Sequence, residues 1–155
     1  MKRTMEQTFS FDYRHYDSLA DLSPRDRELV DRAKEACGTA HAPYSNFQVG
    51  AAARLASGKI ITGSNQESEV IPAGVCAERS LLYYHQAHHA DDPIETLAIA
   101  SLPDRRECYP CGICRQGIND TQRRQGSPIR VIMSGADSAT AIDTATHLLP
   151  FLFEL

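Results

Sequence analysis

Apolar residues recur at helical spacing in the segment that follows residue 22. Ser23 and Pro24 are typical of a helix start, because the serine side chain accepts a hydrogen bond from a free amide and proline loses none at the first helical position. Gly38 then ends the run. We therefore predict an amphipathic helix whose apolar face is formed by Leu29, Val30, Ala33, Ala36 and Cys37.

Further along the chain, short apolar stretches alternate with stretches rich in helix-forming residues. Residues 48–56 and 60–62 flank a Ser-Gly turn at 57–58, which predicts a β-hairpin. Residues 76–87 favour a helix, and another helix is expected to open at Cys111. The short apolar segments 96–101 and 129–133 are typical of buried strands. This order predicts an α/β fold, with a mixed sheet on which helices pack in an α/β or α/β/α arrangement.

The amino-terminal segment differs from the rest. In residues 1–22, Phe9, Phe11 and Tyr13 alternate with polar residues, so we expect an edge strand or a loosely docked arm. We assign residues 23–155 to one domain, since the chain of 155 residues has the length of a single domain.

Composition and charge narrow the class of protein. Hydrophobic residues make up 42% and charged residues 23%, as in ordinary globular proteins. No apolar run approaches the ~20 residues that span a bilayer, and the polar start lacks the apolar core of a secretion signal, so we expect a cytoplasmic protein without membrane association. A net charge of −4 gives no general attraction to nucleic acid and favours a small, weakly charged substrate.

The cysteines point to a metal site. Three of the five lie within residues 108–114, and in a reducing compartment such a cluster indicates metal binding before disulfides. Cys111 and Cys114 are three residues apart at a predicted helix start, so they project from one face, and Cys76 opens the other predicted helix. Helix amino termini lower thiol pKa values. Three thiolates leave a fourth position open, which is the arrangement of a catalytic zinc site.

Two charged residues follow Cys76 closely. Glu78 lies on the same opening turn, near enough to reach a zinc-bound water without being a ligand. Zinc lowers the pKa of its water from 15.7 to about 7, and a carboxylate can carry the released proton onward. Arg79 could donate hydrogen bonds to the thiolate sulfurs and offset their negative charge. The sequence therefore predicts an open metal site with an adjacent proton-transfer group.

Two segments, Cys-Ala-Glu-Arg at 76–79 and Pro-Cys-Gly-Ile-Cys-Arg-Gln at 110–116, resemble the cytidine deaminase family. Three more segments agree in order: 42–52 (Ala-Pro-Tyr-Ser-Asn-Phe-Gln-Val-Gly-Ala-Ala), 63–67 (Gly-Ser-Asn-Gln-Glu) and 148–153 (Leu-Leu-Pro-Phe-Leu-Phe). The resemblance runs from about Ser23 to Phe153. One departure is Ser-Glu-Val-Ile at 68–71, where the family usually has a tyrosine.

The resemblance implies a fold and a reaction. The fold would be three-layer α/β/α with a mixed sheet of about five strands. The reaction would be hydrolytic deamination of cytidine and 2′-deoxycytidine to uridine and 2′-deoxyuridine with release of ammonia, as in pyrimidine salvage. Zinc-bound hydroxide would attack C4 of cytosine, while Glu78 protonates N3 and helps the amine to leave.

It also implies roles for individual residues. One zinc ion per subunit would be held by Cys76, Cys111 and Cys114, with Arg79 beside the sulfurs. Asn65 and Glu67 would bind the ribose 3′-hydroxyl, which both donates and accepts. The Ala77 amide and the Phe47 side chain would line the substrate pocket. Three cysteine ligands resemble the small homotetrameric branch, in which Phe153 would reach the base bound by a neighbouring subunit.

Several alternatives remain open at this stage. Cys108 and Cys76 could join Cys111 and Cys114 as the four ligands of a closed structural zinc knuckle. The protein would then be a nucleoside-binding module with structural zinc. A related deaminase could act on another amine-bearing nucleoside. Acidic charge, the absence of tryptophan and the three-cysteine site disfavour a nucleic-acid-editing deaminase. We expect His85, His88 and His89 to be a solvated helix end and not metal ligands.

Overall fold

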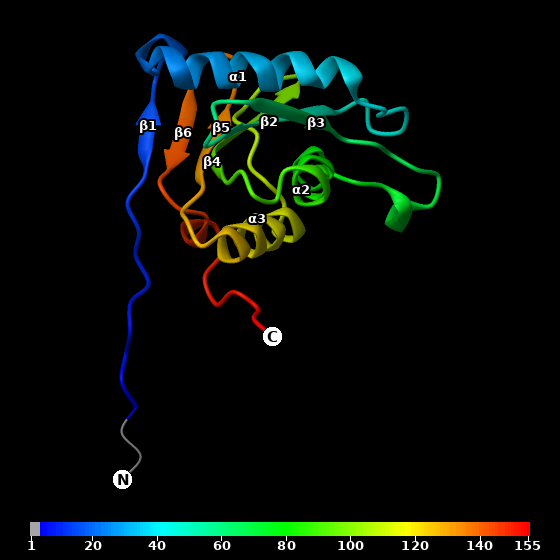
Figure 1. Ribbon diagram of the computed structural model, residues 1–155. Helices are drawn as coiled ribbons and strands as arrows, with labels where there is room; N and C mark the ends of the chain where they lie inside the picture. The colour runs from blue at the N-terminus through cyan, green and yellow to red at the C-terminus, as the bar shows by residue number, and fades with distance from the viewer. Residues whose placement is uncertain (1–3) are drawn as a thin grey trace.

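The computed structural model describes residues 4–155 as a six-stranded mixed sheet with helices on both faces (Figure 1). Helix α1 covers one face, while α2 and α3 cover the other, so the predicted three-layer α/β/α fold is confirmed. The strands lie in the order β1-β6-β5-β4-β2-β3, and only β4 and β5 pair in parallel among them. The elements are β1 (Arg14–Tyr16), α1 (Pro24–Ala36), β2 (Gln48–Leu55), β3 (Ile60–Ser64), α2 (Ala77–His88), β4 (Ile94–Leu102), α3 (Gly112–Gln125), β5 (Arg130–Ser134) and β6 (Ala139–Ile142).

The predicted helices and the hairpin are present. The Ser23 hydroxyl accepts a hydrogen bond from the Asp26 amide, which caps α1 as expected, although α1 itself ends at Ala36 and a short 3₁₀ turn follows. The hairpin forms from β2 and β3. Cys76 and Cys111 stand at the N-cap positions of α2 and α3, so two candidate ligands lie where the backbone amides of a helix are unpaired.

The predicted count of about five strands is wrong, because the sheet has six. Strand β6 has only four residues, and β1 has three; both are too short to show a clear alternation. β1 forms by antiparallel pairing with β6, across a sequence separation that no local pattern reveals. In the arm, Phe9, Phe11 and Tyr13 precede β1 and stay substantially exposed.

Two glycines allow helices to approach the sheet closely. A Cβ atom on Gly50 would lie 2.0 Å from the Ala33 carbonyl oxygen of α1. A Cβ atom on Gly63 would lie 2.8 Å from both the Ala77 carbonyl oxygen and the Leu81 amide nitrogen of α2. The sheet therefore carries α1 on one face and the start of α2, with its chemistry-bearing residues, on the other.

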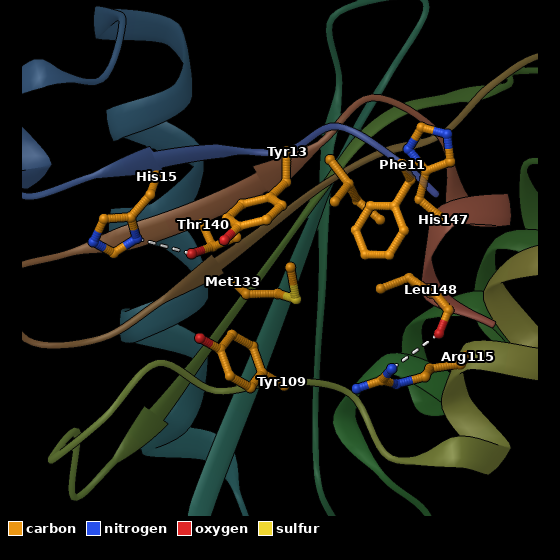
Figure 2. Close-up of a pocket in the computed structure, with 10 residues that line it drawn as sticks. Phe11, Tyr13, His15, Tyr109, Arg115, Met133, Thr140, His147 and Leu148 are labelled. Atoms are coloured by element: carbon orange, nitrogen blue, oxygen red, sulfur yellow. Dashed lines mark hydrogen bonds between the residues drawn. The ribbon is translucent and has the colours of Figure 1, made fainter. Parts of the chain in front are cut away.

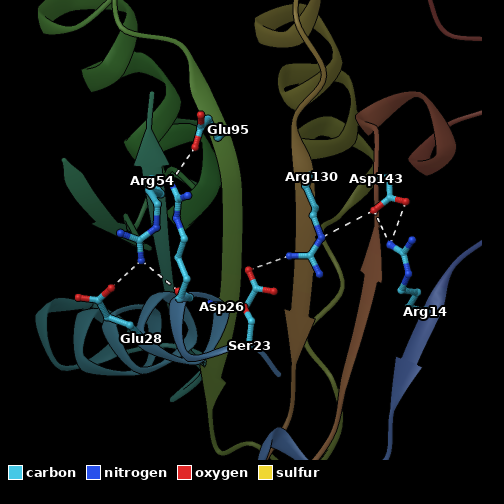
Figure 3. A network of polar contacts seen from close by, with 9 residues as sticks. Arg14, Ser23, Asp26, Glu28, Arg54, Glu95, Arg130 and Asp143 are labelled. Carbon is cyan, nitrogen blue, oxygen red and sulfur yellow. Dashed lines mark hydrogen bonds and ion pairs between the residues drawn. The ribbon is translucent and has the colours of Figure 1, made fainter. Parts of the chain in front are cut away.

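Charged side chains fasten α1 to the strands beneath it (Figure 3). Arg54, which is only 8% exposed, donates to the Arg25 carbonyl oxygen and to the Glu28 carboxylate. Arg130 pairs with Asp26 at 2.8 Å. Because a buried guanidinium must keep its partners, these contacts fix the position of α1 along the strands.

The core between the sheet and helices α2 and α3 is mainly aliphatic. Leu81 and Leu82 of α2 pack with Ile118 of α3 and with β-strand residues. His85 also lies in this layer: it is 2% exposed and its Nε2 is 2.8 Å from the Asp92 carbonyl oxygen, so the prediction that it is solvated is wrong. Histidine is often exposed, but here the packing of α2 and the contact with the Asp92 carbonyl group keep this side chain buried. Within residues 4–155, none of the helices combines the length and apolarity required to traverse a lipid bilayer.

Candidate active site

The starts of α2 and α3 bring three cysteine side chains together. The sulfur atoms of Cys76, Cys111 and Cys114 all lie within 4.8 Å of one another, and those of Cys76 and Cys111 are 4.0 Å apart. Cys114 is buried, Cys76 is half-buried and Cys111 is exposed. Three sulfur atoms at these separations could hold one zinc ion and leave its fourth position without a cysteine, which fits a catalytic zinc site.

The groups around Cys76 favour its thiolate form. Hydrogen bonding from Cys114, followed by donation from Arg79, lowers the pKa of Cys76 to about 5. The same shared hydrogen bond with Cys76 raises the pKa of Cys114. Arg79 Nη2 lies 3.8 Å from Cys76 Sγ, and its buried Nε has no other partner. A soft, partly ionised sulfur set with an arginine beside it fits zinc better than a hard cation such as Mg²⁺.

Glu78 lies on the first turn of α2 and is only 4% exposed. Burial raises the pKa of its carboxyl group to about 7, and the nearby Cys76 thiolate adds to this effect. A carboxyl group with a pKa close to neutrality can both accept and donate a proton at physiological pH. Its burial next to the three sulfur atoms makes it a candidate proton carrier.

Asn65 and Glu67, at the end of β3, hold the loop that precedes β2. Asn65 Oδ1 accepts from the Val49 amide at 2.8 Å, and its Nδ2 donates to the Phe47 carbonyl oxygen at 2.9 Å. Glu67 accepts from the Tyr44 amide at 2.8 Å and from the amide and hydroxyl of Ser45. These bonds lower the pKa of Glu67, so the carboxylate is anionic. Both side chains therefore position the loop that carries Phe47.

Phe47 is 41% exposed and lines a cavity of about 500 Å³ at the ends of β2 and β4. Cys108 forms part of the wall with Ser101, and burial raises the pKa of Cys108 to about 11. Cys108 is absent from the sulfur cluster, which removes the geometric basis for the four-cysteine alternative. Sequence reasoning missed the Arg105 and Arg106 side chains that also line this cavity, because their loop has no motif of its own.

Phe153 lies apart from this cavity, along α3. Its ring is 66% exposed, and its carbonyl oxygen accepts a hydrogen bond from Gln116 Nε2 at 3.0 Å. It lines a shallow depression with Arg123 and Arg124. Ala77 is fully buried, between the Cys76 and Glu78 positions. The structure thus brings Cys76, Cys111 and Cys114 together at the starts of α2 and α3, with Ala77, Glu78 and Arg79 on α2. Phe47, Asn65 and Glu67 lie together where β2 begins and β3 ends, and Phe153 lies apart along α3.

A different cavity, of about 490 Å³, lies between the amino-terminal arm and β6 (Figure 2). Phe11 stacks on His147 with ring centroids 5.4 Å apart, and Tyr13, Tyr109 and Met133 surround the hollow. None of the three clustered cysteines lines it. The chemistry-bearing residues are therefore separate from this aromatic hollow.

Comparisons with known proteins agree on one family. Residues 23–126 match the model of the cytidine and deoxycytidylate deaminase zinc-binding region. A probable cytidine deaminase of Dictyostelium discoideum is 33% identical over 127 residues, which are 81% of this chain and 82% of that protein. The cytidine deaminase of Halalkalibacterium halodurans is 39% identical over 89 residues, 57% of this chain and 65% of that protein.

Solved structures give the same result for the fold. A cytidine deaminase from Burkholderia pseudomallei superposes with a TM-score of 0.69 at 33% identity, covering 81% of this chain and 97% of the other. One from Mycobacterium tuberculosis gives a TM-score of 0.64 at 28% identity, covering 83% of this chain and 96% of the other. The likeness spans nearly the whole of both solved chains.

Proposed function

The chain belongs to the zinc-binding cytidine and deoxycytidylate deaminase family, and from that premise we propose that it hydrolyses cytidine and 2′-deoxycytidine to uridine and 2′-deoxyuridine, releasing ammonia. The observation that carries this proposal is the buried Glu78 carboxyl group beside three sulfur atoms within 4.8 Å of one another. A structural zinc site needs no buried carboxyl group, whereas hydrolytic deamination needs a group that both takes and returns protons.

The proposed chemistry divides between the metal and the chain. Cys76, Cys111 and Cys114 would hold one zinc ion per subunit, and that ion would supply a Lewis acid that makes water nucleophilic near neutral pH. Glu78 accepts a proton from the attacking water and delivers it to N3 of the cytosine ring, and it then carries the second proton to the amino group, which leaves as ammonia. Arg79 stabilises the ionised sulfur of Cys76 through its 3.8 Å contact.

Substrate binding is assigned to the loop ends around β2 and β3. Asn65 and Glu67 provide a donor and an acceptor, which a ribose hydroxyl can satisfy simultaneously. The half-exposed Phe47 ring offers an apolar face to the base, and the Ala77 amide lies between Cys76 and Glu78 in the chain. Glu67 already accepts three hydrogen bonds from residues 44–45, so its geometry is fixed before substrate arrives.

We further propose a homotetramer in which Phe153 contributes to the site of a neighbouring subunit. In the single chain, Phe153, Phe47 and Tyr44 all remain at least 41% exposed, which supports a site that is closed by another copy. The loop before α2 adds Val70 and Ile71, which are 65% and 86% exposed, to this apolar surface. Residues 23–155 act as the catalytic domain of a cytoplasmic enzyme of pyrimidine salvage.

The test is ammonia release from cytidine, 2′-deoxycytidine, cytosine and adenosine by the wild type, Glu78→Gln and Glu69→Gln. Glu69 is an exposed carboxylate on the loop before α2 and serves as the matched control. We expect activity on the two cytosine nucleosides, a loss of at least about 100-fold in kcat for Glu78→Gln, and little change in the control. Zinc-loaded protein that binds cytidine without consuming it would instead support a nucleoside-binding module.

A further inference from the structure

The residue after the buried ligand Cys114 joins two distant segments. Arg115 Nε donates to the Pro110 carbonyl oxygen at 2.9 Å. Its Nη1 donates to the Leu148 carbonyl oxygen at 2.9 Å, as Figure 2 shows. Pro110 immediately precedes the candidate ligand Cys111, while Leu148 begins the carboxy-terminal segment 148–155. One guanidinium therefore links the loop before a metal ligand to the end of the chain.

The next residue makes a second link to the same segment. Gln116 Nε2 donates to the Phe153 carbonyl oxygen at 3.0 Å. The same nitrogen also donates to Asp120 Oδ1 at 2.9 Å, which holds the Gln116 side chain in this orientation. One turn further along α3, the fully buried Asn119 donates to the carbonyl oxygens of Arg115 and Ala145 at 2.9 Å each. The first two turns of α3 thus hold the carboxy-terminal segment at two points, Leu148 and Phe153, and hold Ala145 just before it.

Few other contacts compete for the Arg115 guanidinium. Within residues 4–155 it forms no ion pair, and both of its recorded acceptors are backbone carbonyl oxygens. A planar guanidinium presents donors in fixed directions, so satisfying one carbonyl group fixes the direction of the other. A shift of the segment at Leu148 is therefore transmitted to Pro110 and to the adjoining cysteine.

We propose that Arg115 is a positioning residue that couples the carboxy-terminal segment to the metal loop, so that segment 148–153 and the Cys111 sulfur are ordered together. The inference rests on the proposed function in that it takes the three cysteines as zinc ligands. It assigns the segment that carries Phe153 a role within its own subunit, in addition to contact with a neighbour. Because such coupling is reciprocal, zinc binding should also order the segment.

The experiment measures zinc affinity and tail order separately from catalysis. Zinc affinity is determined by competition with a chromogenic chelator for the wild type, Arg115→Met, Arg115→Lys and the control Arg32→Met. Arg32 lies on α1, on the opposite face of the sheet, and forms an exposed 3.5 Å ion pair with Glu35. Tail order is followed as the rate of chymotrypsin cleavage after Phe151, which is 99% exposed, with mass spectrometry identifying the product.

We expect Arg115→Met to bind zinc about 10-fold more weakly and Arg115→Lys to lie between it and the wild type, because lysine can reach one carbonyl group but not both in fixed geometry. Arg32→Met should stay within about twofold of the wild type, as substitution of an exposed side chain does. Cleavage after Phe151 should be faster in Arg115→Met, and also in wild-type protein stripped of zinc.

Unchanged zinc affinity in a folded Arg115→Met variant would overturn the coupling, as would wild-type cleavage that is the same with and without zinc. The second measurement needs no variant, so it decides the question even if Arg115→Met does not fold. A wild type that deaminates no nucleoside, yet shows zinc-dependent protection of the tail, would defeat the proposed function and leave this coupling in place.

Discussion

Replacing Gly63 with alanine tests how strongly the sheet positions α2. The new Cβ atom would lie 2.8 Å from the Ala77 carbonyl oxygen and the Leu81 amide nitrogen, and 2.9 Å from Leu81 Cβ. Ordinary contact begins at 3.4 Å, so the first turn of α2 must move by about 0.6 Å. Because these are backbone atoms of a helix, no side-chain rotation relieves the overlap.

We expect two consequences. Overpacking of this kind costs about 1–3 kcal/mol, which lowers the melting temperature by roughly 2–10 °C for a chain of this length. The displaced turn carries Cys76 at its cap and Glu78 within it. Since misplacement of a catalytic group by about 1 Å can cost 100-fold in rate, a shift of half that size should reduce kcat by about 10-fold.

The assay is thermal unfolding followed by circular dichroism, together with cytidine turnover and zinc content. Gly38→Ala is the matched control, because its Cβ atom would meet nothing within 4 Å and its backbone does not adopt positive φ. A melting temperature and kcat for Gly63→Ala equal to those of Gly38→Ala would refute the view that this close approach positions α2.

Three further predictions concern charge and metal. In metal-free protein, burial raises the pKa of Glu78 to about 7, above the ordinary 4.5, so the contribution of this group to stability is greatest below about pH 4.5 and is lost as the pH rises to about 7. Glu78→Gln should remove this loss, worth about 3 kcal/mol, and pH-dependent urea unfolding showing the same curve for both proteins would contradict it. Arg54→Met should cost about 1–3 kcal/mol because it removes both hydrogen bonds of a buried guanidinium, whereas Arg27→Met, from an exposed pair, should cost less than about 1 kcal/mol by urea unfolding. Cys111→Ser should lose bound zinc by elemental analysis while Cys108→Ser retains it, and equal zinc in both variants would exclude the proposed ligand set.

Local patterns were sufficient for the helices and the hairpin. The Ser23 cap and the apolar face behind it specify α1 through interactions within four residues. The same holds for the sulfur ligands, because Cys76 and Cys111 each occupy a helix cap and Cys114 follows within one turn. Helix geometry converts such spacing directly into side-chain direction. Fold class and metal chemistry were therefore predictable without knowledge of long-range contacts.

Other features depend on contacts between distant segments. β1 exists only through pairing with β6, and the burial of His85 depends on the Asp92 carbonyl group and the packing of α2 and α3. The raised pKa of Glu78 arises from desolvation, which the residue type and its neighbours in sequence do not specify.

By itself, then, the sequence determined that three cysteines and a carboxylate stand at two helix starts, because caps and helical spacing are local properties. Only the tertiary structure decided that these helix starts meet, with sulfur atoms within 4.8 Å, and that Arg115 joins the metal loop to the chain end. Bringing such segments together closes long loops, which costs conformational entropy. Packing across the whole sheet offsets that cost, and no single motif does so.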